Sequence, residues 1–148
     1  MCGIVSVVNR ETDRPVSKPE LVSMVRTLRH RGPDEEGCVV LNGVGLAMRR
    51  LSIIDVQGGQ QPFQSEDGHI HLVANGEIYN YGKLRKQLVS CGHHFRSQSD
   101  IEVLVHAYEE WGEAFLKHIN GMFALALWDG RTRTFIAARD RAGEKPLY

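Results

Sequence analysis

A cysteine stands second in the chain, between Met1 and Gly3. Because the residue after the initiator methionine is small, an aminopeptidase can remove Met1 and leave Cys2 with a free α-amine. A thiol with a reference pKa near 8.5 and an amine with one of about 8 can act as nucleophile and base near neutral pH. Position alone also fits a small hydrophobe at the start of a strand. Cys38 and Cys91 have no such neighbour, and we predict that both are structural.

A cysteine that attacks a carboxamide generates an oxyanion, which requires preorganised hydrogen-bond donors. The pair Asn75-Gly76 can provide an amide side chain and a backbone N–H, although Asn-Gly is also a common turn. A free amino acid needs a partner for its carboxylate and another for its ammonium, and Arg50 and Asp100 have the right chemistry. Asp100 could equally be a favourable charge in the first turn of a helix.

Two histidine pairs, His93-His94 and His69 with His71, suggest metal ligands. Neither pair has a third or fourth ligand at a suitable spacing, so we predict no metal site. The chain also contains no glycine-rich phosphate loop, so we expect no recognisable ATP site in these residues.

The composition fits one globular domain. The chain has 148 residues, 18 basic and 18 acidic side chains, 42% apolar residues and 24% charged residues. A net charge of zero gives no field that would attract nucleic acid or an anionic membrane. No apolar run approaches the roughly 20 residues that span a bilayer, and the N-terminus lacks the basic stretch and apolar segment of a signal peptide. Three widely spaced cysteines suit a reducing compartment, so we expect a cytoplasmic protein.

Two helices are expected to follow capping boxes. The first box is Ser17-Lys-Pro-Glu20, followed by Leu21, Met24, Val25 and Leu28 before Gly32-Pro33. The second is Ser99-Asp-Ile-Glu102, with an apolar face of Ile101, Leu104, Val105 and Tyr108 and a stop at Gly112. Between them, we expect a helix that carries Tyr81, Leu84 and Leu88 and ends at Gly92.

The strands are expected towards both ends of the chain. Residues 3–9 form a β-branched segment, and Asn42-Gly43 and Asp129-Gly130 predict hairpins joining 38–41 to 44–51 and 121–128 to 132–138. Residues 69–74 predict another strand, with a sharp turn at Asn75-Gly76. This distribution favours an α+β layered domain. Because the chain stops at the apolar segment 145–148, we expect a fragment of a longer protein.

Taken together, the motifs resemble the N-terminal glutaminase domain of class II glutamine amidotransferases, and more narrowly that of glutamine-hydrolysing asparagine synthetases. The resemblance spans residues 1–148 and depends on the order and spacing of these motifs: Cys2-Gly-Ile, Arg29-His-Arg-Gly-Pro-Asp34, Arg50-Leu-Ser-Ile-Ile-Asp55, Gln61-Pro62, Asn75-Gly-Glu-Ile-Tyr-Asn80, Ser99-Asp100, Phe123-Ala-Leu-Ala-Leu-Trp-Asp129, and Arg139-Asp-Arg141 with Lys145-Pro-Leu-Tyr148.

The resemblance implies an N-terminal-nucleophile hydrolase fold, an αββα sandwich of two antiparallel sheets between helical layers, truncated at its C-terminus. It implies hydrolysis of glutamine through a γ-glutamyl thioester on the processed Cys2, with Asn75 and Gly76 as the oxyanion hole. Arg50 and Asp100 would hold the glutamine carboxylate and ammonium. The rest of the pocket would be lined by Leu51, Ser52, Ile53, Ile54 and Glu77.

The resemblance also implies partners. Ammonia would pass to a C-terminal synthetase domain beyond residue 148, where ATP and Mg²⁺ would activate aspartate, and the whole protein could form a homodimer. No cofactor is implied within residues 1–148. Three alternatives remain open at this point: a related amidotransferase that aminates another carboxylate, an amidase for acylated amines, which Arg50 and Asp100 disfavour, and a regulatory relative without activity.

Overall fold

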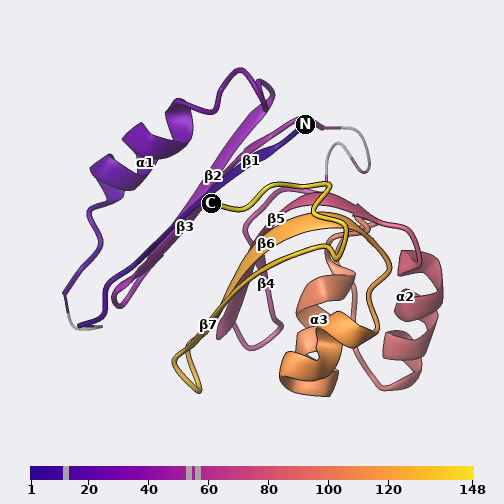
Figure 1. Cartoon of the computed structure of the whole chain (residues 1–148). Helices are drawn as coiled ribbons and strands as arrows, with labels where there is room; N and C mark the ends of the chain where they lie inside the picture. Colours follow the sequence, from indigo (N-terminus) through magenta and orange to yellow (C-terminus); the bar gives the residue numbers. More distant parts are fainter. Residues whose placement is uncertain (12–13, 53–54, 56–57) are drawn as a thin grey trace.

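The computed structural model describes residues 1–11, 14–52, 55 and 58–148. Two antiparallel sheets lie face to face, with helices on their outer sides (Figure 1). The first sheet has the order β1-β3-β2 and consists of β1 (Gly3–Val8), β3 (Val44–Arg50) and β2 (Glu35–Leu41). The second has the order β4-β5-β6-β7 and consists of β4 (Phe63–Gln64), β5 (Ile70–Ile78), β6 (Gly121–Asp129) and β7 (Thr134–Arg139).

The helices cover the outer faces of the two sheets (Figure 1). Helix α1 (Lys18–Arg26) contacts the first sheet, and α2 (Tyr81–Ser90) and α3 (Val103–Trp111) lie against the second. A 3₁₀ helix, η1 (Gly112–Lys117), follows α3. The predicted αββα sandwich is therefore confirmed. No helix in the described part of the chain is long and apolar enough to cross a membrane.

Alternating side chains explain why the layers stack in this order. On β3, one set of residues faces the second sheet, in a core of Val44, Leu46, Met48, Val73, Ala126 and Trp128. Ala47 faces the other way, towards Leu21 and Val25 of α1. Successive side chains of a strand point to opposite faces, so β3 can be buried on both sides. The remaining face of the second sheet packs against α2 and α3 in the largest core cluster.

The predicted turn at Asn75-Gly76 is wrong, because both residues lie inside β5. Asn75 is opposite Ala124 and Gly76 is opposite Phe123 in an unbroken antiparallel ladder with β6. A Cβ atom at position 76 would lie 2.1 Å from the Met122 carbonyl oxygen. The apolar run of β6 offers pairing along the whole of β5, and glycine serves here for close approach of two backbones.

The first capping box is confirmed and the second is wrong. Ser17 is the N-cap of α1, and its hydroxyl accepts the Glu20 N–H, although the helix ends at Arg26, earlier than predicted. Helix α3 begins only at Val103, without a side-chain cap. The Glu102 carboxylate instead accepts the N–H groups of Arg96 and Ser97, which ties the preceding loop to the start of the helix.

Both predicted hairpins and the helix that contains Leu84 and Leu88 are confirmed. The register places Leu41 opposite Val44 in the first hairpin and Asp129 opposite Thr134 in the second. Strand β2 begins at Glu35, before the predicted start at Cys38. Its first residues lack an apolar run, and it is the full-length pairing with β3 that makes them a strand.

The carboxylate of Asp140 fixes the segment that follows β7. It accepts the backbone N–H groups of Phe123, Glu144 and Lys145 at 3.2, 2.9 and 3.0 Å. Burial alone would raise the pKa of this carboxyl, but these N–H groups outweigh it and lower the pKa from 3.8 to about 2. The chain end is thereby held against β6, and it returns towards the first sheet (Figure 1).

Replacing Asp140 with Asn should change how stability depends on pH. A carboxyl whose pKa is depressed by folding contributes stability above its unfolded pKa and loses it as the pH falls through the folded value. We expect the free energy of unfolding of the wild type to exceed that of Asp140→Asn by a constant amount above about pH 5. The gap should shrink as the pH falls from 3.8 towards about 2. Urea unfolding of both proteins at a series of pH values measures this difference in the free energy of unfolding. A difference that does not depend on pH would contradict this account.

Candidate active site

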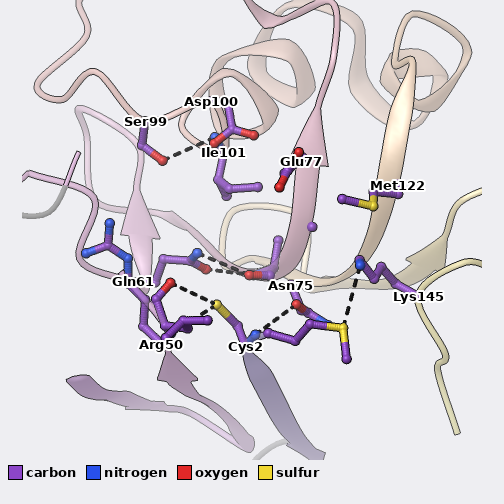
Figure 2. A pocket seen from close by; sticks show the side chains of 14 residues that line it. Cys2, Arg50, Gln61, Asn75, Glu77, Ser99, Asp100, Ile101, Met122 and Lys145 are labelled. Atoms are coloured by element: carbon purple, nitrogen blue, oxygen red, sulfur yellow. Dashed lines mark hydrogen bonds between the residues drawn. The ribbon is translucent and has the colours of Figure 1, made fainter. Parts of the chain in front are cut away.

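The residues predicted to do chemistry meet in one pocket (Figure 2). It has a cavity volume of about 160 Å³. Its wall combines the N-terminal residues with the end of β3, the second half of β5 and the loop before α3. The lining residues are Met1, Cys2, Arg50, Leu51, Gln61, Ala74, Asn75, Gly76, Glu77, Ser99, Asp100, Ile101, Met122 and Lys145.

The Cys2 thiol is held by the main chain of Leu51. The Leu51 N–H lies 3.4 Å from the sulfur, and the Leu51 carbonyl oxygen lies 3.8 Å from it. This contact follows from the pairing of β1 with β3, in which Gly3 is opposite Arg49. The Arg31 guanidinium donates to the Cys2 carbonyl oxygen at 3.1 Å. The thiol therefore has a fixed direction, towards the pocket.

Asn75 reaches Cys2 from the other sheet. Its side-chain oxygen accepts the Cys2 N–H at 3.1 Å, across 73 residues of sequence (Figure 2). Since the oxygen of this amide is engaged by Cys2, its NH₂ group remains as a donor for the pocket. Gly76 follows on the same strand and also lines the cavity. A side-chain amide and a backbone N–H beside a thiol are donors of the kind that can stabilise an oxyanion.

Gln61 fixes the position of β5 next to Asn75, and the sequence analysis did not identify it as a site residue. Its side-chain oxygen accepts the Ala74 N–H at 2.7 Å, and its NH₂ donates to the Ala74 carbonyl at 3.1 Å. A side-chain amide here replaces the hydrogen bonds that a neighbouring strand would make. Nothing in the residue type or local spacing of Gln61 indicates this contact.

Arg50 is buried at the edge of the pocket, with 5% of its surface exposed. Its guanidinium donates to the Glu35 carboxylate at 2.9 Å and to the Asp55 carbonyl oxygen at 2.8 Å. Glu35 is opposite Arg50 in the ladder between β2 and β3. These contacts fix the plane of a group that carries five N–H donors and binds carboxylates in a two-pronged geometry.

Asp100 places a buried carboxylate on the far wall of the cavity (Figure 2). One of its oxygens accepts the Ile78 N–H of β5 at 2.7 Å. Burial raises the pKa of this carboxyl, and the backbone N–H bond acts in the opposite direction. Because α3 begins three residues later, Asp100 is not a charge in the first helical turn. It is directed at the strand and the pocket.

The other predicted lining residues divide into three groups. Leu51 and Glu77 line the pocket. Ser52 is not among the lining residues, its N–H donates to Asp34, and its hydroxyl is buried without a hydrogen-bond partner among the described residues. Ile53 and Ile54 lie outside the described residues. The predictions for these two stay predictions.

Several lining residues were missed because only the tertiary structure brings them to the pocket. Met122 arrives through the β5–β6 ladder, Ser99 and Ile101 flank Asp100, and Ala74 precedes Asn75. The Lys145 ammonium lies 3.8 Å from the Met1 sulfur (Figure 2). Among the missed lining residues, Gln61, Ser99 and Lys145 belong to the motifs that carry the family resemblance. No histidine is among the lining residues, so neither predicted histidine pair belongs to this site.

Comparison with a known structure supports the fold. Glutamine phosphoribosylpyrophosphate amidotransferase from Bacillus subtilis, solved in complex with ADP and GMP, superposes with a TM-score of 0.70. The superposition covers 93% of this chain and 37% of that one, at 20% sequence identity. At this identity the likeness concerns the fold, which is that of the N-terminal-nucleophile hydrolases.

Sequence comparison is more specific. The chain is 45% identical over 148 residues to asparagine synthetase [glutamine-hydrolyzing] 3 of Arabidopsis thaliana, and 44% identical over 150 residues to asparagine synthetase [glutamine-hydrolyzing] 2 of Bacillus subtilis. It spans 25% and 20% of their lengths. The family model for the glutamine amidotransferase domain matches residues 1–148. With its fold and its cysteine pocket, this chain belongs to the glutamine amidotransferase domain family.

Proposed function

We propose that this domain hydrolyses glutamine to glutamate and ammonia, with Cys2 as the nucleophile. The observation that carries the proposal is the meeting of Cys2 with Asn75 in a pocket that also contains Arg50 and Asp100. Hydrolysis of a free amino acid amide requires a nucleophile, an oxyanion donor, a partner for the carboxylate and a partner for the ammonium. The pocket offers one group for each: a thiol, an amide donor, a guanidinium and a carboxylate. A hydrophobic acyl-amide would need neither of the two charged residues.

The first half of the reaction forms a thioester. Once Met1 is removed, the α-amine of Cys2 takes the thiol proton, and the sulfur attacks the side-chain carbonyl carbon of glutamine. The NH₂ of Asn75 and the N–H of Gly76 bind the oxyanion that develops on the tetrahedral intermediate. When this intermediate collapses, the C–N bond breaks and the Cys2 ammonium returns its proton to the leaving ammonia.

The second half returns the enzyme to its starting state. The α-amine takes a proton from water, and the resulting hydroxide attacks the thioester carbon while the same donors bind the oxyanion. The C–S bond then breaks, and the proton passes from the α-ammonium to the thiolate. Glutamate leaves, and Cys2 is again a thiol beside a neutral amine.

Recognition of glutamine is assigned to the two buried charges. The Arg50 guanidinium, oriented by Glu35, binds the α-carboxylate, and Asp100 accepts from the α-ammonium together with Glu77. Main-chain atoms of Leu51 and of the residues after it complete the pocket. Because Ile78 already occupies one Asp100 oxygen, the carboxylate is held in place before substrate arrives.

We further propose that the ammonia is used for asparagine synthesis. The matched relatives are named glutamine-hydrolysing asparagine synthetases, and this chain corresponds to 25% or less of the two compared above. The rest of such a chain would contain the synthetase domain, where ATP and Mg²⁺ activate aspartate for attack by ammonia. No residue among 1–148 is assigned to that step.

Labelling with 6-diazo-5-oxo-norleucine, an alkylating mimic of glutamine, tests the nucleophile and the pocket together. We expect one adduct per chain, located by peptide mapping on an N-terminal Cys2 without Met1. Cys2→Ala should take up none, whereas Cys38→Ser should be labelled like the wild type because Cys38 packs in the core beneath α1. A folded, Met1-free chain that remains unlabelled would refute the proposed glutamine site.

Asp100→Asn should affect substrate binding more than chemistry. The Asn side chain can still accept the Ile78 N–H, but it removes the negative charge that faces the α-ammonium. Loss of a charged hydrogen bond predicts an increase in KM for glutamine of about 10- to 100-fold. The effect on kcat should be smaller. Asp67→Asn, at an exposed carboxylate that pairs with Arg131, is the matched control, and steady-state glutaminase kinetics provide the measurement. Equal behaviour of the two variants would remove Asp100 from the site.

The synthetase assignment is tested in the full-length protein with Cys2→Ala. Because the substitution removes only the nucleophile, glutamine-dependent asparagine synthesis should be lost while synthesis from added ammonia continues. Asparagine is quantified by mass spectrometry with each nitrogen source. Loss of both activities would contradict the separation of the two reactions, and an ammonia-dependent product other than asparagine would change the acceptor.

A further inference from the structure

A second cluster of ligand-type side chains lies outside the glutamine pocket. It consists of Glu66 from the β4–β5 connection, His93 from the segment after α2, and His106 from α3. One possible ligand atom from each of the three residues lies within 4.8 Å of the others. His106 has 2% of its side chain exposed and His93 has 15%, so the cluster extends from the interior to the surface.

Carboxylates stand at both nitrogens of both imidazole rings. The Nδ1 atoms of His93 and His106 lie 3.7 and 3.1 Å from the same oxygen of Glu109. The His93 Nε2 lies 3.2 Å from Glu110, and the His106 Nε2 lies 3.8 Å from Glu102. A neutral imidazole carries one N–H and one lone pair, so one nitrogen of each ring faces a carboxylate without a proton to share. A cation placed at those lone pairs would relieve the repulsion.

The negative charge around the two rings also favours a bound cation. Four glutamates surround them, at positions 66, 102, 109 and 110. Among the described residues, all four glutamates form their ion pairs with histidines, and none pairs with a lysine or arginine. A divalent cation bound to the two rings would neutralise part of the negative charge of these carboxylates.

We propose that Glu66, His93 and His106 form a zinc site. Two imidazoles and one carboxylate are a ligand set that Zn²⁺ favours, whereas Mg²⁺ and Ca²⁺ prefer oxygen ligands alone. One nitrogen of each ring binds the ion, and the other donates its proton to a glutamate that already stands beside it. Metal-bound histidines usually have such a carboxylate partner, which fixes the ring and raises its basicity.

Closure of the site requires a small movement. Two ligands of a tetrahedral zinc ion lie about 3.3 Å apart, so ligand atoms separated by up to 4.8 Å must approach one another. One Glu66 oxygen accepts the His94 N–H at 2.8 Å, so the approach is assigned to the other oxygen of this carboxylate, whose side chain is 45% exposed. His106 stays fixed in α3, and Glu109 is close enough to both rings to add a further oxygen.

A bound ion would link three segments that are separate in sequence. It would join the β4–β5 connection to the chain after α2 and to α3. Glu102, which accepts the Arg96 and Ser97 N–H groups, lies beside His106, and Asp100 lies between Ser97 and α3. Zinc should therefore stabilise the folded protein, including the loop that carries Asp100, because it binds a site that the unfolded chain lacks.

Isothermal titration of the metal-free protein with ZnCl₂, paired with thermal unfolding, tests the site. We expect His93→Gln and Glu66→Gln each to weaken zinc binding by at least about 10-fold and to reduce the rise in Tm that zinc produces. His30→Gln is the matched control, since it removes an exposed imidazole that lies after α1 and outside the cluster, and it should bind zinc like the wild type. The two test positions are near the surface, so folding of the variants is expected and is checked by circular dichroism.

Zinc could instead bind the thiol of Cys2, and a Cys2→Ser variant separates the two sites. Retention of the histidine-dependent binding in Cys2→Ser supports the proposal. The proposal is overturned if zinc does not bind, if binding is unchanged in both His93→Gln and Glu66→Gln, or if Cys2→Ser abolishes it. None of these outcomes depends on glutaminase activity, so the zinc site and the proposed function stand or fall separately.

Discussion

The packing of one sheet against the other is the constraint on which the site depends. Cys2 precedes the first strand of one sheet, and Asn75 lies within the second strand of the other. The apolar contact that includes Leu46 and Met48 on one side and Val73 and Trp128 on the other brings them together. Cys2 itself packs against this core, so its thiol is positioned by the interaction that holds the sandwich together.

A close approach between β5 and β6 makes the second half of the site possible. Neither Gly76 nor Gly121 has room for a Cβ atom. At position 76 this atom would lie 2.1 Å from the Met122 carbonyl oxygen, and at position 121 it would lie 2.3 Å from the Glu77 carbonyl oxygen. Without side chains at these positions, the ladder continues past Asn75 to Ile78. The same strand therefore presents Asn75 and Gly76 to the thiol and the Ile78 N–H to Asp100.

The rim of the pocket is held by side chains that bind backbone. Gln61 bonds both polar groups of Ala74, and Asp140 gathers the N–H groups of Phe123, Glu144 and Lys145. Arg50 is in turn fixed by Glu35 and the Asp55 carbonyl. Loops that lack regular secondary structure thereby satisfy their polar groups and present a rigid wall, which is what a preorganised site requires.

The sequence by itself determined the local elements and the chemical candidates. Apolar periodicity, capping and turn residues predicted α1, α2 and both hairpins, and the motifs indicated the family and the roles of Cys2, Arg50, Asn75 and Asp100. The predictions of these local elements succeed because they depend on neighbours within a few positions, whereas the roles of the four site residues stay predictions. They failed at Asn75-Gly76 and at the second capping box, where pairing with β6 and bonds to Arg96 and Ser97 override the local preference.

Only the tertiary structure decided which distant groups meet. The contact of Cys2 with Asn75 spans 73 residues. No sequence spacing reveals that Gln61 lies beside Ala74. The grouping of Glu66 with His93 and His106 is equally invisible in the sequence. The sequence analysis found two histidine pairs without further ligands, because the third and fourth candidates lie on other elements. Strand register and helix packing bring these residues together, and both are set by burial of the whole core rather than by any local pattern.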